Sequence, residues 1–217
     1  MKRSKCLICD SEKLIRVIKL GMHPFADSFI SEKRFSESEK VYPLNCMLCE
    51  ECGHLQNEYL TSPNDRYSDH EYSYTSSNSN FSKNHWIEFS NIVFSKIPLN
   101  GRTQKVLEIG SNDGFLGAIA KEKGFEYIGV DASPHMVSLA KKNKIKTICG
   151  LFGKEIKNRL KDRFNCFELI IANNVLNHAD NLIEFISSVE KLLSKNGIFV
   201  FEVPYWLIDF QNNRFDK

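Results

Sequence analysis

The sequence predicts an α/β protein in which a helix-covered parallel sheet follows a small domain of different chemistry. From Gly101 onward, apolar strands alternate with helical stretches, and this order implies right-handed crossovers and a parallel sheet. Five of the seven cysteines instead lie within residues 1–65, where long periodic segments are few. We therefore expect a cysteine-rich domain at residues 1–65, a connecting segment at residues 66–100 and an α/β domain at residues 101–217.

The composition is that of a globular protein with no strong electrostatic preference for a partner. The 217 residues are 42% hydrophobic and 26% charged with a formal net charge of +2, so we expect no nucleic-acid partner. No apolar run approaches the roughly 20 residues that span a bilayer, and the start MKRSKCLICD has no apolar signal segment. We expect no membrane partner and a cytoplasmic location, where cysteines serve as metal ligands or free thiols rather than disulfides.

The cysteines of the first domain form pairs with metal-ligand spacing. Cys6 and Cys9 make one C-x2-C pair, and the stretch CMLCEECG supplies the second. There Cys46, Cys49 and Cys52 are each three apart, so two pairings compete. We favour Cys49 with Cys52, because the glycine directly after them allows a tight turn in which backbone N–H groups point at thiolate sulfur.

Four cysteine thiolates in a tetrahedral array suit zinc. With all four positions taken by cysteine, no coordination site is open, and the zinc is expected to hold the domain together rather than to do chemistry. Two alternatives stay open: His54 in place of one cysteine, and uncoordinated buried thiols. A zinc ribbon that binds nucleic acid is disfavoured, because no basic patch accompanies the cysteines.

The connecting segment begins with a Ser/Asn/Tyr-rich run and then becomes helical. Trp86, Phe89, Val93 and Ile97 have the spacing that lines one helix face, and Pro98-Leu99-Asn100-Gly101 is expected to stop the helix.

The α/β domain is expected to contain five strands and four helices. The strands are Lys105–Ile109, Tyr127–Val130, Ile145–Ile148, Phe167–Ala172 and Gly197–Val203. The helices are Asp113–Lys123, Pro134–Lys142, Glu155–Leu160 and Leu182–Leu193. Ligands of such sheets bind outside the carboxyl ends of the strands.

The stretch VLEIGSNDGFL turns from the first of these strands into a helix, through Gly110 and Asn112. Glycine lets the backbone approach a ligand closely, and Asp131 at the end of the next strand can accept bonds from two ribose hydroxyls. NAD sites use G-x-G-x-x-G, whereas this loop reads G-x-N-x-G, and Asp113 would repel a diphosphate. Glu108 suits a cationic ligand, so we favour S-adenosylmethionine (SAM), which carries an ammonium, a sulfonium and no phosphate. A tight turn without a ligand is the third alternative.

Three further residues are placed near this pocket by their position after strands. Phe152 is a candidate cover for the adenine face, with core packing as the alternative role. Asn173 and Asn174 leave the fourth strand, where amide groups can accept from an ammonium and donate to a carboxylate. Cys149 and Cys166 are expected to be small core residues.

On these motifs the chain resembles the SAM-dependent C-methyltransferases that act on nucleotide-linked keto-deoxysugars. The matching stretches are Cys6-x2-Cys9, LGMHPFADSF, YPLNCMLCEECGHLQ, EYSYTSS, VLEIGSNDGFL, IIANNVLNH and FVFEVPY. The resemblance implies a class I (Rossmann-like) SAM-methyltransferase core behind a small N-terminal zinc-binding domain, with a nucleotide-sugar substrate.

The resemblance also implies roles for particular residues. Zinc is bound by the four favoured cysteines: Cys6, Cys9, Cys49 and Cys52. Gly110, Asn112 and Asp131 lie in the SAM site, and Tyr74 and His178 match active-site positions. The implied reaction removes a proton from carbon next to a ketone, and the enolate carbon then takes the methyl group; His178 can accept or donate that proton, and Tyr74 can donate to an oxygen. His70 and His85 are expected at the surface.

The family continues past the position of NRFDK into a Tyr-His-Glu-His stretch and a C-terminal domain. We therefore expect a chain truncated after strand five, with an apolar edge at Ile198–Val203, a separately encoded C-terminal half as partner, and reduced or no activity alone. The alternatives are a small-molecule O- or N-methyltransferase and a noncatalytic half-enzyme or interaction module that binds zinc and SAM.

Overall fold

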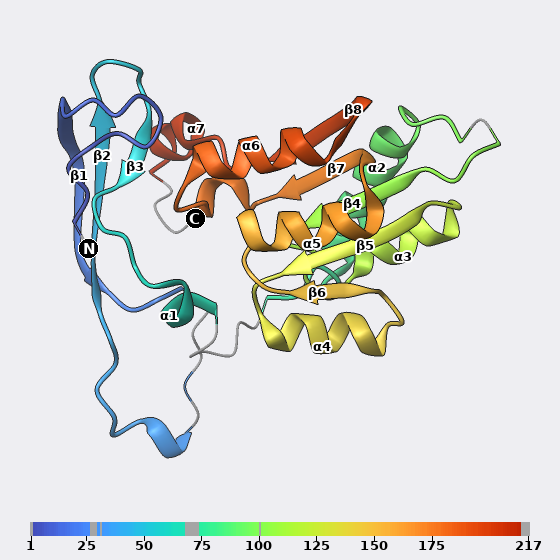
Figure 1. Ribbon diagram of the computed structural model, residues 1–217. Coiled ribbons are helices and arrows are strands. Elements are labelled where there is room, and N and C mark those ends of the chain that lie inside the picture. The colour runs from blue at the N-terminus through green and yellow to red at the C-terminus, as the bar shows by residue number, and fades with distance from the viewer. Residues whose placement is uncertain (1, 27–29, 31, 68–73, 100, 214–217) are drawn as a thin grey trace.

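Two sheets of different type organise the chain in the computed structural model of Figure 1. The structure describes residues 2–26, 30, 32–67, 74–99 and 101–213. Of the residues considered above, His70 and part of the tyrosine-rich stretch lie outside this description. An antiparallel sheet with strand order β1-β2-β3 precedes a parallel sheet with strand order β6-β5-β4-β7-β8.

The N-terminal domain is built on the antiparallel sheet, which the sequence analysis did not predict. Its strands are β1 (Leu14–His23), β2 (Tyr42–Cys49) and β3 (Leu55–Asn57), with a short 3-10 helix η1 (Glu32–Arg34) and helix α1 (Pro63–Tyr67). Glu58 is buried directly after β3, where its carboxylate accepts bonds from Arg16 at 2.7 Å and Asn45 at 2.6 Å. The Arg16 bond is the main cause that lowers the pKa of Glu58 to about 2, and it outweighs the opposing effect of desolvation.

The α/β domain has the expected alternation of strands and helices. Its strands are β4 (Lys105–Ile109), β5 (Glu126–Asp131), β6 (Thr147–Cys149), β7 (Phe167–Asn173) and β8 (Leu193–Glu202). Its helices are α2 (Asn80–Phe94), α3 (Phe115–Glu122), α4 (Pro134–Lys142), α5 (Lys154–Phe164), η2 (Leu176–His178), α6 (Leu182–Leu192) and α7 (Trp206–Gln211).

Helices cover both faces of the parallel sheet, so its central strands β4, β5 and β7 are mostly buried and apolar on both sides. On one face α5 and α6 pack through Leu160 and Val189 onto strand residues such as Leu107 and Ile170. On the other face α2, α3 and α4 pack onto residues that alternate with these, among them Val106. Among the described residues, no helix combines the length and apolar character needed to cross a membrane.

Several boundaries differ from the sequence expectation. α2 ends at Phe94, where Ser95 caps it, so Ile97 is buried beyond the helix rather than on its face. α5 continues to Phe164, and β8 begins at Leu193. β8 is the outer strand of the described sheet, and apolar side chains along it, including Phe201, are exposed as expected for an edge.

The carboxyl ends of the parallel strands face the N-terminal domain. Figure 1 shows the arrowhead of β7 directed toward the side on which β1, β2 and β3 lie. Asp180, in the loop after β7, forms ion pairs with Arg66 and Arg3 of the N-terminal domain. The edge of the sheet at which α/β proteins bind ligands therefore lies between the two domains.

Candidate functional site

A cavity of about 380 Å³ opens at the carboxyl ends of the parallel strands. This volume lies in the range of small-molecule sites, roughly 300–1,000 Å³. Every cofactor-binding and catalytic residue predicted from sequence, apart from Glu108, lines the cavity: Tyr74, Gly110, Asn112, Asp131, Phe152, Asn173 and His178. Residues from β4, β5, β7 and the connecting segment thus meet around one space.

The glycine loop after β4 is shaped by backbone conformations that bring it close to the neighbouring loop. Gly110 has φ +73°, and a Cβ built there would lie 2.1 Å from Cγ2 of Val175. Asn112 also has positive φ, and its amide oxygen accepts from the Ser76 N–H at 2.9 Å while its amide nitrogen donates to the Tyr74 carbonyl at 3.0 Å. Asn112 therefore fixes the tyrosine-bearing segment against the loop.

Asp131 connects the ends of β4 and β5. One carboxylate oxygen accepts from the Asn112 N–H and the other from the Ser133 N–H, both at 2.8 Å. Burial raises the pKa of Asp131, and the two backbone bonds oppose that rise. Since each carboxylate oxygen has a second lone pair, Asp131 can still accept hydrogen bonds from a ligand in the cavity.

Glu108 does not lie where the sequence argument put it. It is absent from the cavity lining, is buried behind the glycine loop and accepts a hydrogen bond from the Tyr127 hydroxyl. Burial is the main cause that raises the pKa of Glu108 to about 8. A carboxyl that is largely protonated at neutral pH and faces Tyr127 does not support the direct contact with a cationic ligand that we expected.

His178 and Tyr74 lie on different walls of the cavity. His178 ends η2, and the pKa of its imidazole is lowered, first by desolvation and second by the Arg66 guanidinium. By surface area His178 is an exposed residue, and it lines the cavity. A neutral imidazole at pH 7 can accept a proton. Tyr74 is an exposed residue, and its hydroxyl lies 3.5 Å from the Ser82 hydroxyl.

Asn173 carries the clearest sign that the cavity takes a polar ligand. Both its amide nitrogen and its amide oxygen are buried and have no hydrogen-bond partner among the described residues. Buried polar groups are almost always paired, so a ligand with a donor and an acceptor would satisfy this side chain. The ammonium and carboxylate of SAM are such a pair, and Phe152, held edge-on to Phe185 at 4.9 Å, offers an apolar wall.

The structure adds cavity residues that the sequence analysis did not assign to the site. They are chiefly Arg66, Tyr67, Trp86, Ser133, Asp180 and Glu184. Ser133 caps α4 just after Asp131 and could have been found from that position. Arg66 and Tyr67 carry no local signal, because only the packing of the N-terminal domain brings α1 to the cavity. His85 is exposed as expected, and it pairs with Glu202 at 3.1 Å.

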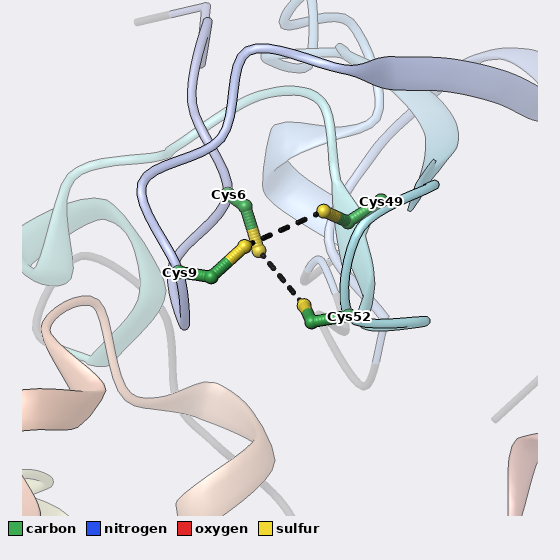
Figure 2. Close-up of side chains that lie close together, drawn as sticks. All are labelled: Cys6, Cys9, Cys49 and Cys52. Atoms are coloured by element: carbon green, nitrogen blue, oxygen red, sulfur yellow. Dashed lines mark hydrogen bonds between the residues drawn. The ribbon is translucent and has the colours of Figure 1, made fainter.

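The four favoured cysteines come together at the edge of the N-terminal sheet, as Figure 2 shows. Their Sγ atoms all lie within 4.8 Å of one another, and the Cys6–Cys52 and Cys9–Cys49 separations are both 3.6 Å. Ligands about 2.3 Å from a tetrahedral zinc ion would lie about 3.8 Å apart, so this donor set and spacing fit zinc.

The other cysteines stay apart from this cluster. Cys46 has its Sγ 4.0 Å from the Asn57 amide oxygen and is not grouped with the four, and neither is His54. Cys149, expected in the core, is exposed at the end of β6, directly before the cavity-lining segment that begins at Gly150. Cys166 is only partly buried.

The five-stranded parallel sheet with a ligand cavity at its carboxyl edge defines the Rossmann-like SAM-methyltransferase fold. The chain belongs to a methyltransferase family: it matches the family described as "Methyltransferase domain" over residues 81–217, more than half of its length. Residues 6–67 match a family described as "Putative zinc binding domain".

Individual relatives agree with this assignment. C-methyltransferase NovU of Streptomyces niveus is 24% identical over 212 residues, which cover 98% of this chain and 50% of that protein. The ubiquinone biosynthesis O-methyltransferase of Pelagibacter ubique (strain HTCC1062) is 34% identical over 98 residues, 43% of this chain and 39% of that protein. The chain thus spans half or less of the length of these two relatives.

A solved structure supports the fold alone. The crystal structure of PH0226 protein from Pyrococcus horikoshii OT3 aligns with a TM-score of 0.51 at 19% identity, over 64% of this chain and 63% of that one.

Proposed function

We propose that the chain binds SAM in this cavity and serves in methyl transfer to a carbon atom of a nucleotide-linked keto-deoxysugar. The observation that carries the proposal is the meeting of the glycine loop, Asp131 and His178 around one cavity, in which the Asn173 amide has no hydrogen-bond partner among the described residues. The similarity to NovU over 98% of the chain supports transfer to carbon.

Four side chains and one glycine would hold the cofactor. Asp131 would accept from the ribose hydroxyls and Phe152 would lie against the adenine, while Gly110 leaves room for close approach. Asn173 would bond the amino-acid end, and Asn112 would keep the loop in place through its contacts with Tyr74 and Ser76. SAM supplies an electrophilic methyl group on a sulfonium.

The acceptor chemistry would fall to His178 and Tyr74. The neutral imidazole would take the proton from carbon next to the ketone, so that the C–H bond breaks and its electron pair forms an enolate. The Tyr74 hydroxyl would donate to the oxygen on which negative charge develops. Bound SAM would supply the electrophilic methyl group to the enolate carbon, with a neutral thioether as the leaving group.

Zinc would contribute structure rather than chemistry. Cys6, Cys9, Cys49 and Cys52 fill a tetrahedral coordination sphere, so no position remains for substrate.

The test combines calorimetry with isotope labelling. Zinc-loaded protein is titrated with SAM, and then incubated with methyl-¹³C SAM and a panel of nucleotide-diphosphate keto-deoxysugars, with His178→Gln as the comparison variant. We expect SAM to bind both proteins with similar affinity and a carbon-bound ¹³C-methyl signal to appear with the wild type alone. A folded protein that binds no SAM would refute the proposal.

The same experiment separates the alternatives. A labelled methyl group on oxygen or nitrogen would favour an O- or N-methyltransferase, which the match to the Pelagibacter O-methyltransferase makes the second candidate. SAM binding without transfer to any acceptor would support the expectation that a separately encoded half completes the acceptor site, or that the chain is a noncatalytic module.

A further inference from the structure

Arg66 connects the N-terminal domain to the loop that carries His178. Its Nη2 donates to the carboxylate of Asp180, and its Nη1 donates to the His178 carbonyl at 3.4 Å. Arg3, also from the N-terminal domain, lies 3.9 Å from the other oxygen of Asp180. Two residues of one short loop are therefore held by guanidinium groups from a different domain.

The Arg66–Asp180 pair is partly buried, and the Arg66–His178 bond is exposed. The Arg66 side chain is 18% exposed and that of Asp180 31% exposed, and the Nε of Arg66 is fully buried. Ion pairs that are partly buried are screened less by solvent than surface pairs, so this pair can hold a loop in position.

The loop is also held by apolar packing, since Val175, Leu176 and Ala179 pack against the hydrophobic core. Its hydrogen bonds are mostly local: within the described residues, the backbone bonds of η2 run from His178 to Val175 and from Ala179 to Leu176. At its start, the Asn174 N–H donates to the Glu202 carbonyl. Arg66, which bonds both the backbone of His178 and the side chain two residues later, thus adds a contact from the N-terminal domain at the polar end of this loop.

We propose that Arg66 is a positioning residue for His178, through which the folded N-terminal domain fixes the histidine at the cavity. This inference rests on the proposed role of His178 in proton transfer. In this proposal Arg66 does not contact a reacting atom and acts only through the position of His178. Guanidinium is suited to the task because its planar donors can bond two acceptors at once, which an ammonium at the same place does less well.

The test uses full-length, zinc-loaded protein and two readouts. The first is the titration of the His178 imidazole by NMR, assigned with His178→Gln. The titratable groups that face the same cavity are Arg66, Tyr67, Tyr74, Asp131, Asp180 and Glu184. Removing the Arg66 charge in Arg66→Gln is expected to raise the pKa of His178, because that charge disfavours the imidazolium. The control Lys19→Gln removes an exposed positive charge from β1 of the N-terminal domain and should leave the pKa of His178 unchanged.

The second readout is amide hydrogen exchange over residues 175–181. We expect faster exchange in Arg66→Gln and in Asp180→Asn, and an intermediate rate in Arg66→Lys. In the Arg66→Gln/Asp180→Asn double variant the increase should be smaller than the sum of the two single increases, because both changes break the Arg66–Asp180 pair. Unchanged exchange together with an unchanged His178 titration in Arg66→Gln would overturn the inference.

Kinetic measurements connect the positioning role of Arg66 to the proposed function. With an accepted substrate, Arg66→Gln should lower kcat on the order of 10- to 100-fold, since small misplacements of a catalytic group have effects of this size, and SAM affinity should persist. If the chain methylates no acceptor, the NMR titration and the amide exchange decide whether Arg66 positions His178. Altered titration and exchange with an unaltered kcat would refute the role of His178 and the positioning role together.

Discussion

The carboxylate of Asp131 is joined to the backbone N–H of Asn112 by a hydrogen bond of 2.8 Å, so the residue proposed to bind the ribose also holds the glycine loop. Its second oxygen bonds the Ser133 N–H at the start of α4. One side chain therefore sets the positions of two segments that line the cavity.

Asp131→Ala should abolish most SAM binding, because it removes both the ribose contact and the anchor of the loop. Hydrogen bonds to charged groups contribute about 1.5–3 kcal/mol, so we expect affinity to fall roughly 10- to 150-fold or more by calorimetry. Asp162→Ala, on the exposed side of α5, is the matched control. Equal affinities for the two variants would exclude Asp131 from the cofactor site.

Gly110→Ala should be more harmful than a change at another left-handed glycine. Gly101 has φ +70° with open space around it, whereas at Gly110 an added Cβ meets Val175. Both changes cost about 1–2 kcal/mol of backbone strain, and overpacking adds about 1–3 kcal/mol at Gly110 alone. Urea unfolding of both variants measures the difference. Equal losses of stability would mean that the loop of Gly110 and the loop of Val175 are not in close contact.

Glu108→Gln should remove a pH dependence of stability. Glu108 ionises near its ordinary pKa of 4.5 in the unfolded chain and near 8 in the folded one. Between these values the folded state alone holds the proton, so the stability of the wild type falls as pH rises, by at most about 1.4 kcal/mol per pH unit. Below 4.5 both states are protonated, and above about 8 both are ionised.

Urea unfolding between pH 5.5 and 7.5 checks this sign. The decrease in the free energy of unfolding with rising pH should be smaller in Glu108→Gln than in the wild type. Glu126→Gln, at an exposed position on β5, should show the same decrease as the wild type. A slope that is identical in all three proteins would show that Glu108 is ionised in the folded state.

Cys49→Ser should lose the metal, and Cys46→Ser should keep it. Both cysteines lie on β2, but only Cys49 belongs to the four-sulfur cluster. Metal analysis of the purified proteins should give one zinc ion per chain for the wild type and Cys46→Ser, with chelation unfolding the N-terminal domain. Zinc retained by Cys49→Ser but lost by Cys46→Ser would reverse the choice between the two pairings.

Local patterns were sufficient for most of the α/β domain. β4 and α4 begin and end at the predicted residues, because an apolar run between polar turns and a Ser-Pro start are local signals. The strands of the N-terminal domain were not predicted. β1 has register shifts between Arg16 and Ile18 and between Lys19 and Met22, and these irregularities break the period-two alternation that identifies a strand.

The site was predictable where residues follow directly after strands, and not where distant segments meet. Glu108 shows that the alternation of side chains along a strand could have improved the prediction of the site. Leu107 and Ile109 face α5 and α6, so Glu108 must share the opposite face with Val106, where it meets Tyr127 instead of the cavity. Arg66 reaches the cavity through the docking of a separate domain, which no local pattern encodes.

The exposed thiol of Cys149 offers a practical way to search for the methyl acceptor. It stands one residue before the cavity-lining Gly150, whereas Cys46 and Cys166 are partly covered and the remaining four thiols form the zinc-type cluster. An environment-sensitive dye attached there would sit at the rim of the cavity and change brightness when a compound enters. Unlabelled candidate acceptors could then be ranked by fluorescence before any chemistry is known.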